Sequence, residues 1–155
     1  MSRIYSVSFA GVAVTAQQDF FELVAAAGKP IRPLAIFLSQ SSEVGDAAEE
    51  GLSILIKSGQ STSGSGGSAP TPVPQNASDA AAGFTAETNN TTKASTGTIV
   101  THHAANWIIR QPFELILPER LQQEISGGRR WTCELATTPA DSITVSGTIV
   151  VEEFG

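Results

Sequence analysis

The side chains best suited to chemistry in this 155-residue chain are two adjacent histidines and one cysteine. On a strand, His102 and His103 would point to opposite faces, so they are poorly placed to chelate one metal ion together. Cys133 alternates with Trp131 and Leu135, a pattern more typical of a small buried hydrophobe than of a nucleophile. We therefore expect no catalytic residues, no metal site and no cofactor, and we predict that the protein is not an enzyme.

A second group of reactive side chains is acidic and consists of Glu43, Asp46, Glu49 and Glu50. Paired carboxylates can hydrolyse glycosides, and carboxylate oxygens are also ligands for calcium. The spacing of a calcium-binding Asp-x-Asp-x-Asp-Gly loop is missing, so we interpret the group as a solvated surface or a subunit contact. Metal binding and catalysis remain the alternatives for these residues.

Two short motifs in the middle of the chain have simple explanations. The glycine-rich residues 63–67 lack the lysine and the following Ser or Thr that a phosphate-binding loop requires, which favours a flexible linker. Asn76, Asn89 and Asn90 begin matches to the glycosylation sequon, a short and common pattern. We interpret these asparagines as polar loop residues.

The composition excludes several classes of partner. The chain has a net charge of −6, and only 15% of its residues are charged. An acidic chain lacks the basic face that nucleic acids or anionic membranes attract, so we expect neither as a partner. A single cysteine excludes an internal disulfide, and no apolar run reaches the roughly 18 residues of a membrane span. The length is that of one domain with its own core.

Alternation of apolar and polar residues, the signal of a half-buried strand, recurs along the chain. It is clearest at residues 143–151, where Ile143, Val145, Ile149 and Val151 share one face. Further strands are predicted at residues 4–14, 21–25, 34–38, 52–56, 96–102, 106–110, 113–117 and 131–135. Short strands separated by turn residues are typical of an antiparallel sandwich. We predict a single all-β domain over residues 1–155, a β-sandwich of the jelly-roll or another Greek-key type.

Local signals add one bulge and two short helices to this plan. The alternation up to Phe9 changes phase before Val12, which a bulge at Ala10–Gly11 would explain. Residues 46–49 have the spacing of a capping box, and residues 118–125 begin with a proline suited to the first helical position. Both helices would be short connectors between strands.

Residues 59–95 differ from the rest, because Val73 and Phe84 are their only large apolar side chains. Glycines and serines come first, and the spaced prolines of residues 70–74 favour extended backbone. Such a segment buries too little apolar surface to offset the entropy lost on ordering. We predict a long, flexible arm inserted between two strands, with Val73 and Phe84 as its contacts to a partner.

Four blocks of the sequence resemble small structural proteins of tailed phages and prophages, of the capsid decoration or cement type. The blocks are FLSQSSEVGDAAEEGLSILI (37–56), TSGSGGSAPTP (62–72), SDAAAGFTAETNNTTKASTGT (78–98) and PADSITVSGTIVVEE (139–153). Together they cover most of the chain. Residues 106–111, NWIIRQ, depart from the group, in which we expect a more polar stretch that contains glycine.

The resemblance implies a non-catalytic virion protein that binds and stabilises the outside of a phage capsid shell. Its partners would be two further copies in a homotrimer and the major capsid protein, with weak contacts summed through avidity. It would assemble in the bacterial host cytoplasm and reside on the capsid surface. An ion site on the symmetry axis of such a trimer stays open.

The alternative is a phage-associated adhesin or head-fibre module of the same fold that binds carbohydrate or a host receptor. Trp107 and Trp131 are the aromatic candidates for sugar stacking, although both fall within strand patterns that favour core packing.

Overall fold

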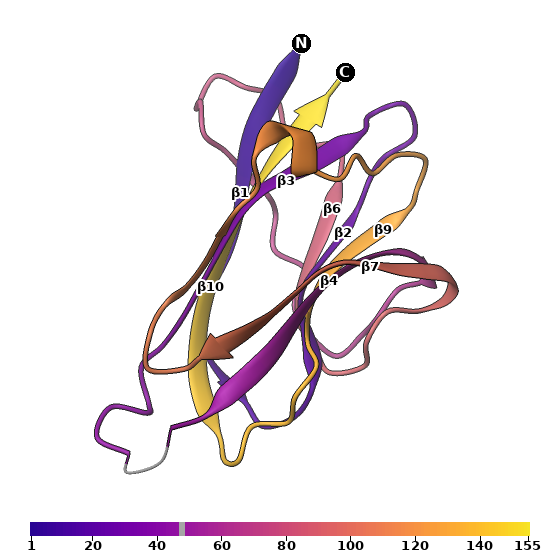
Figure 1. The fold of residues 1–155 in the computed structure, drawn as a ribbon. Helices are drawn as coiled ribbons and strands as arrows, with labels where there is room; N and C mark the ends of the chain where they lie inside the picture. The colour runs from indigo at the N-terminus through magenta and orange to yellow at the C-terminus, as the bar shows by residue number, and fades with distance from the viewer. Residues whose placement is uncertain (47–48) are drawn as a thin grey trace.

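The computed structural model describes residues 1–46 and 49–155, which form two antiparallel sheets packed face to face (Figure 1). The strands are β1 (Ser2–Val14), β2 (Gln18–Val24), β3 (Ile31–Gln40), β4 (Gly51–Thr62), β5 (Val73–Pro74), β6 (Thr85–Asn90), β7 (Ser95–Ile108), β8 (Phe113–Ile116), β9 (Arg130–Leu135) and β10 (Ile143–Phe154). Sheet A has the order β5-β1-β10-β3-β8, and sheet B has the order β6-β2-β9-β4-β7. The predicted all-β sandwich is confirmed.

The pairing of the strands shows which kind of sandwich this is. Strand β1 pairs with β10, β2 with β9, β3 with β8 and β4 with β7, so the chain pairs its first half with its second half. Every connection among these eight strands crosses to the other sheet, except the one between β4 and β7. This is the jelly-roll arrangement of two four-stranded sheets, to which β5 and β6 add one edge strand each.

The core lies between the sheets and follows the period of two. Strand β10 alternates buried and half-buried residues along its whole length. Gly147 belongs to the inward row, where an added Cβ would lie 2.8 Å from Leu38 Cδ2 and 2.9 Å from the ring of Phe9. Trp107 and Trp131 are both buried in this core, so neither offers the exposed face that sugar stacking requires.

The predicted bulge is present in β1. The register between β1 and β10 shifts between Phe9 and Val12, and Gly11 adopts a φ of 63°. Glycine adopts this conformation without strain, so the bulge has a sequence cause. The two strands predicted at residues 96–102 and 106–110 are one continuous strand, β7.

Helix is limited to one 3-10 turn, Glu119–Leu121, within the part of the chain that the structure describes. The helix predicted over residues 118–125 is therefore shorter than expected, because Ile125 exchanges two backbone hydrogen bonds with Ile31 and extends the chain. The turn predicted at residues 46–49 includes residues 47–48, which lie outside the described residues. No described helix is long and apolar enough to cross a membrane.

Residues 63–94, which join β4 to β7, form an insert that folds against the sandwich. Strand β5 pairs with β1 at Tyr5 and Ser6, and β6 pairs with β2 along most of its length. Bridges between Ser65 and Thr92 and between Ser68 and Thr88 close the insert on itself. The predicted extended arm is thus corrected to a segment that supplies one edge strand to each sheet. Backbone hydrogen bonds with the sandwich order this segment, although it has few apolar side chains.

Phe84 lies inside the protein's own core rather than on a partner-binding surface. It is 2% exposed, and its ring meets that of Tyr5 edge-on at a centroid distance of 5.7 Å. Backbone N–H groups of Gly83 and Phe84 donate to the buried carboxylate of Glu153. This burial corrects the prediction for Phe84. Val73 is 60% exposed on β5, so it remains a predicted partner contact.

Candidate functional site

The structure does not unite the histidines and the cysteine in one site. Strand β4 separates β7, which carries His102, from β9, which carries Cys133. His102 Nε2 lies 2.6 Å from the hydroxyl of Ser58. Cys133 is fully buried, and its burial, together with the charges of Asp19 and Glu134, raises the pKa of the thiol far above its usual range. The thiol is therefore neutral and inert.

The acidic residues expected at the surface gather at one end of the sandwich, where the β3–β4 and β9–β10 connections meet. Carboxylate oxygens of Glu43, Asp46 and Asp141 lie within 4.8 Å of one another, and Glu43 is the buried member. A hydrogen bond from Ser42 lowers the pKa of Glu43, but hydrogen bonding to Asp46, burial and the charge of Asp141 together raise it. Arg110 donates to the backbone carbonyl of Asp46 and adds a positive charge here.

A more deeply buried polar group covers the outer face of sheet B. We call Asp19, Glu22 and Glu134 the carboxylate layer; they are 1%, 1% and 6% exposed. Their strand neighbours point into the core, so alternation sends these three side chains to the opposite face. The insert and its flanking residues lie over them and exclude solvent. Buried charges require partners, and each of the three has them.

The insert supplies most of these partners. The backbone N–H of Gly64 donates to Glu22 at 2.9 Å, and Asn90 Nδ2 donates to the same oxygen at 3.1 Å. Arg130 Nε lies 3.5 Å from the other oxygen of Glu22. The backbone N–H of Ala94 donates to Asp19 at 2.8 Å. The carboxylate layer therefore fixes the insert at both of its ends.

Glu134 completes the layer with two lysines. Lys57 Nζ lies 2.7 Å from one of its oxygens and Lys93 Nζ lies 3.0 Å from the other. Burial alone would raise the pKa of Glu134, but the hydrogen bonds and charges of the two lysines lower it below its usual range. Glu134 is thus a charged anchor between the body and the end of the insert.

Asp19 behaves differently, because its single backbone donor does not offset its burial. Burial raises the pKa of Asp19 to about 7, the N–H of Ala94 lowers it, and the charges of Glu134 and Glu22 raise it further. The carboxylate layer thus contains one group that titrates near neutral pH.

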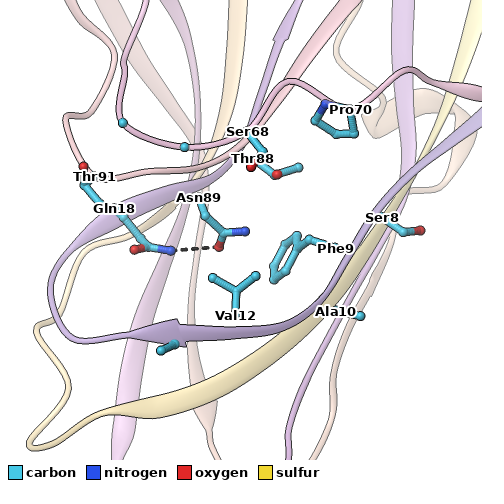
Figure 2. Close-up of a pocket in the computed structure, with 13 residues that line it drawn as sticks. Ser8, Phe9, Ala10, Val12, Gln18, Ser68, Pro70, Thr88, Asn89 and Thr91 are labelled. Carbon is cyan, nitrogen blue, oxygen red and sulfur yellow. Dashed lines mark hydrogen bonds between the residues drawn. The ribbon is translucent and has the colours of Figure 1, made fainter.

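Next to this layer, a cleft of about 430 Å³ opens between the edge of β1 and the insert (Figure 2). Its walls come from residues 8–13, 66–70 and 88–91, with Gln18 at the start of β2. Beyond Ser6, β1 has no strand neighbour on this side among the described residues, because β5 pairs only with Tyr5 and Ser6. None of the lining residues is charged, in contrast to the adjacent carboxylate layer.

Asn89 is the central polar group of the cleft. Its φ of 56° lies in the left-handed region, where a residue other than glycine is uncommon. Gln18 Nε2 donates to Asn89 Oδ1 at 2.8 Å, which leaves the Asn89 amide nitrogen free to donate elsewhere. Figure 2 shows that this nitrogen points toward Phe9, across the cleft. Asn is among the residues that adopt this conformation most readily after glycine.

The carboxylate layer and the cleft share one piece of chain. Asn90 turns to Glu22, and its side-chain oxygen accepts the N–H of Gly67 at 3.2 Å. Its neighbour Asn89 turns to the cleft and binds Gln18. Because Asn90 is held in the buried layer, Asn89 is presented to the cleft in a fixed orientation.

The other candidate surface is the free edge of sheet B, formed by residues 95–108 of β7. Every residue from Ser95 to His102 is exposed, and Ile99 and Val100 are among the exposed large apolar side chains. Residues 94–109 contain no Asp, Glu, Lys or Arg. Natural edge strands are commonly protected by charges or prolines. The β7 edge has neither, which is typical of a strand that a partner covers.

No family model, curated protein or solved structure matches this chain. The phage resemblance therefore stays a prediction.

Sequence reasoning did not find the carboxylate layer or the cleft. Asp19 and Glu22 occupy polar positions of a strand pattern, where an exposed face is the usual interpretation. The one available signal was Asn89-Asn90, which matched a sequon and was interpreted as loop. An Asn pair between strands also suits left-handed backbone, and that signal indicates Asn89.

Proposed function

We propose that the protein is a non-catalytic virion structural protein that binds the outside of a tailed-phage capsid shell and stabilises it. It acts as a homotrimer, with the major capsid protein as its second partner, on the capsid surface after assembly in the bacterial host cytoplasm. The sequence resemblance suggests this role. The jelly-roll topology is compatible with it, since viral capsid proteins and lectins both use this fold.

The observation that carries the proposal is the β7 edge. An uncharged strand whose residues 95–102 are exposed on both faces and on the free edge is suited to contact with a neighbouring protein. A second copy of the chain is the occupant that we assign to it. Two such copies can approach there without repulsion, even though the whole chain carries a net charge of −6.

This contact differs from the arm-mediated one predicted from the sequence. The insert is held against its own sandwich, so it does not reach a neighbour in the way that a free arm would. Val73 is exposed at the outer edge of sheet A and is the part of the insert that we assign to the shell contact.

The test is to place charge on the β7 edge. The double variant Ile99→Lys/Thr101→Lys changes two exposed side chains, so the fold should persist. We expect light scattering to show a trimer for the wild type and a monomer for the variant, together with weaker binding to emptied phage heads. The control is Val44→Lys, because Val44 is 84% exposed in the β3–β4 loop, beyond the end of β4 opposite to the one that pairs with Thr101. A wild-type monomer that ignores phage heads would refute the proposal.

A second function is favoured by a separate observation. The uncharged cleft beside Asn89, on a fold that lectins also use, suits an adhesin or head-fibre module that binds carbohydrate or a host receptor. In that case the variant Ile99→Lys/Thr101→Lys would leave binding to host cells unchanged.

A further inference from the structure

We propose that the cleft between β1 and the insert is a binding site for a neutral saccharide, with Asn89 as its principal hydrogen-bond donor. This inference rests on the second candidate function and names its ligand class, and it is separate from the shell-binding role, because the cleft and the β7 edge lie on opposite edges of sheet B. The proposal depends on four features: size, charge, polar groups and the shape of the β1 edge.

Size and charge define the ligand class. The volume of about 430 Å³ lies within the range of about 300–1,000 Å³ typical of small-molecule sites. The lining contains no ionisable side chain, so a charged ligand would lose its hydration without gaining an ionic partner. A ligand rich in hydroxyl groups costs less to desolvate than a charged one, and polar groups of the cleft can replace the hydrogen bonds that it loses to water.

The polar and apolar groups of the cleft match the two sides of a sugar ring. Asn89 offers its free amide nitrogen and Thr88 offers a hydroxyl group that can donate or accept, whereas the Ser8 hydroxyl points away from Phe9 and pairs with Thr148. Phe9 and Val12 form an apolar wall in the same cleft, as Figure 2 shows. The hydroxyl groups of a hexose can bond to the first set, while its C–H face packs on the second.

The donor is oriented before any ligand arrives. Asn89 is 92% buried, its side-chain oxygen is engaged by Gln18, and Asn90 beside it is fixed by Glu22. The free nitrogen therefore has little freedom to lose on binding, which favours affinity. The left-handed φ of 56° at Asn89 sets the direction in which its side chain leaves the backbone, and the hydrogen bond from Gln18 holds the amide there.

The shape of the β1 edge disfavours the main competing ligand, an extended peptide. A peptide would add to β1 as a further strand and would need a regular row of backbone groups. The bulge between Phe9 and Val12 interrupts that row within the cleft. A compact ligand that uses side-chain donors does not depend on it.

The first experiment screens the full chain against immobilised neutral glycans built from glucose, galactose, mannose and N-acetylglucosamine, beside sialylated and sulfated glycans. We expect signal on neutral glycans only. Calorimetry with the best soluble oligosaccharide should give a dissociation constant of about 0.1–1 mM, as suits a few hydrogen bonds and a small apolar contact. Absence of signal on every neutral glycan, or preference for the anionic ones, overturns the proposal.

The second experiment uses Asn89→Gly, which removes the amide but keeps a residue that accepts positive φ. We expect about tenfold weaker saccharide binding, since one directed hydrogen bond to the ligand and the Gln18 contact are lost. Ser68→Trp, which should fill the cleft from the exposed side of the insert, should abolish binding. Asn106→Ala on β7 is the matched control and should bind as the wild type does.

These variants separate the saccharide site from the proposed function. Asn89→Gly should keep the trimer and its binding to phage heads, because the β7 edge is unaltered. Wild-type affinity for the oligosaccharide in both Asn89→Gly and Ser68→Trp would place the saccharide elsewhere and overturn the proposal, whatever the result with phage heads.

Discussion

The two outer edges of sheet B differ in what orders the chain there. On one side, β6 and the rest of the insert have a glycine- and serine-rich sequence with few apolar residues, yet they lie fixed over the carboxylate layer. On the other side, β7 has a strand-like sequence, yet its first eight residues are exposed on both faces. Buried hydrogen bonds therefore order one edge, whereas the other edge is left available to a partner.

Prolines protect the edge strand that the insert adds to sheet A, β5. The N–H of Gln75 donates to the carbonyl of Ile4 on β1. Since successive backbone N–H positions alternate in direction along a strand, the nitrogens of the prolines at 72 and 74 face away from β1. There they need no N–H, and they prevent a further strand from pairing at that edge of sheet A. Residues 94–109, which include the β7 edge, contain no proline and no charged residue, although the register of β7 against β4 shifts at two points.

The largest expected effect tests whether the insert is part of the core. Phe84→Ala should lower the free energy of unfolding by about 4 kcal/mol, because it empties a buried site against Tyr5. Ile99→Ala on β7 is the matched change, and we expect it to stay within about 0.5 kcal/mol of wild type. Urea unfolding measures both. Equal losses of unfolding free energy in the two variants would mean that the insert is no more part of the core than β7 is.

The next effect concerns the carboxylate layer. Glu22→Ala should cost about 3 kcal/mol, since it leaves Arg130, Asn90 and the N–H of Gly64 without their buried partner. Thermal unfolding at low protein concentration provides the measurement. Glu114→Ala, at an exposed position of β8, is the control and should be nearly neutral. A neutral Glu22→Ala would mean that the layer does not hold the insert.

A smaller effect depends on pH. The folded-state pKa of Asp19, about 7, is above its ordinary value, so the native state binds the proton more tightly than the unfolded state. This stabilisation is complete at low pH and is lost as the pH rises toward 7, by up to about 1.4 kcal/mol per pH unit. Denaturant unfolding should therefore show that the contribution of Asp19 to the free energy of unfolding falls between pH 5 and 7 in the wild type. The variant Asp19→Asn should lack this pH-dependent contribution. Glu43→Gln controls for the other carboxyl with a raised pKa.

The smallest expected effect on stability belongs to Val73. Val73→Ala should change the free energy of unfolding by less than about 0.5 kcal/mol, because the side chain is 60% exposed on a two-residue strand. Val73→Glu should be equally well folded but should bind emptied phage heads more weakly. Unchanged head binding by Val73→Glu would exclude Val73 from the shell contact.

The sequence by itself determined the sandwich, the bulge at Gly11 and most strands, because period-two patterns and glycine conformations are local properties. The jelly-roll order required the structure, since periodicity does not encode which strands pair. The insert was misjudged because apolar content was taken as the only source of order, whereas Gly64, Asn90 and Ala94 bond to carboxylates more than 40 residues away. Only tertiary structure brings those partners together, and with them it orients Asn89 in the cleft.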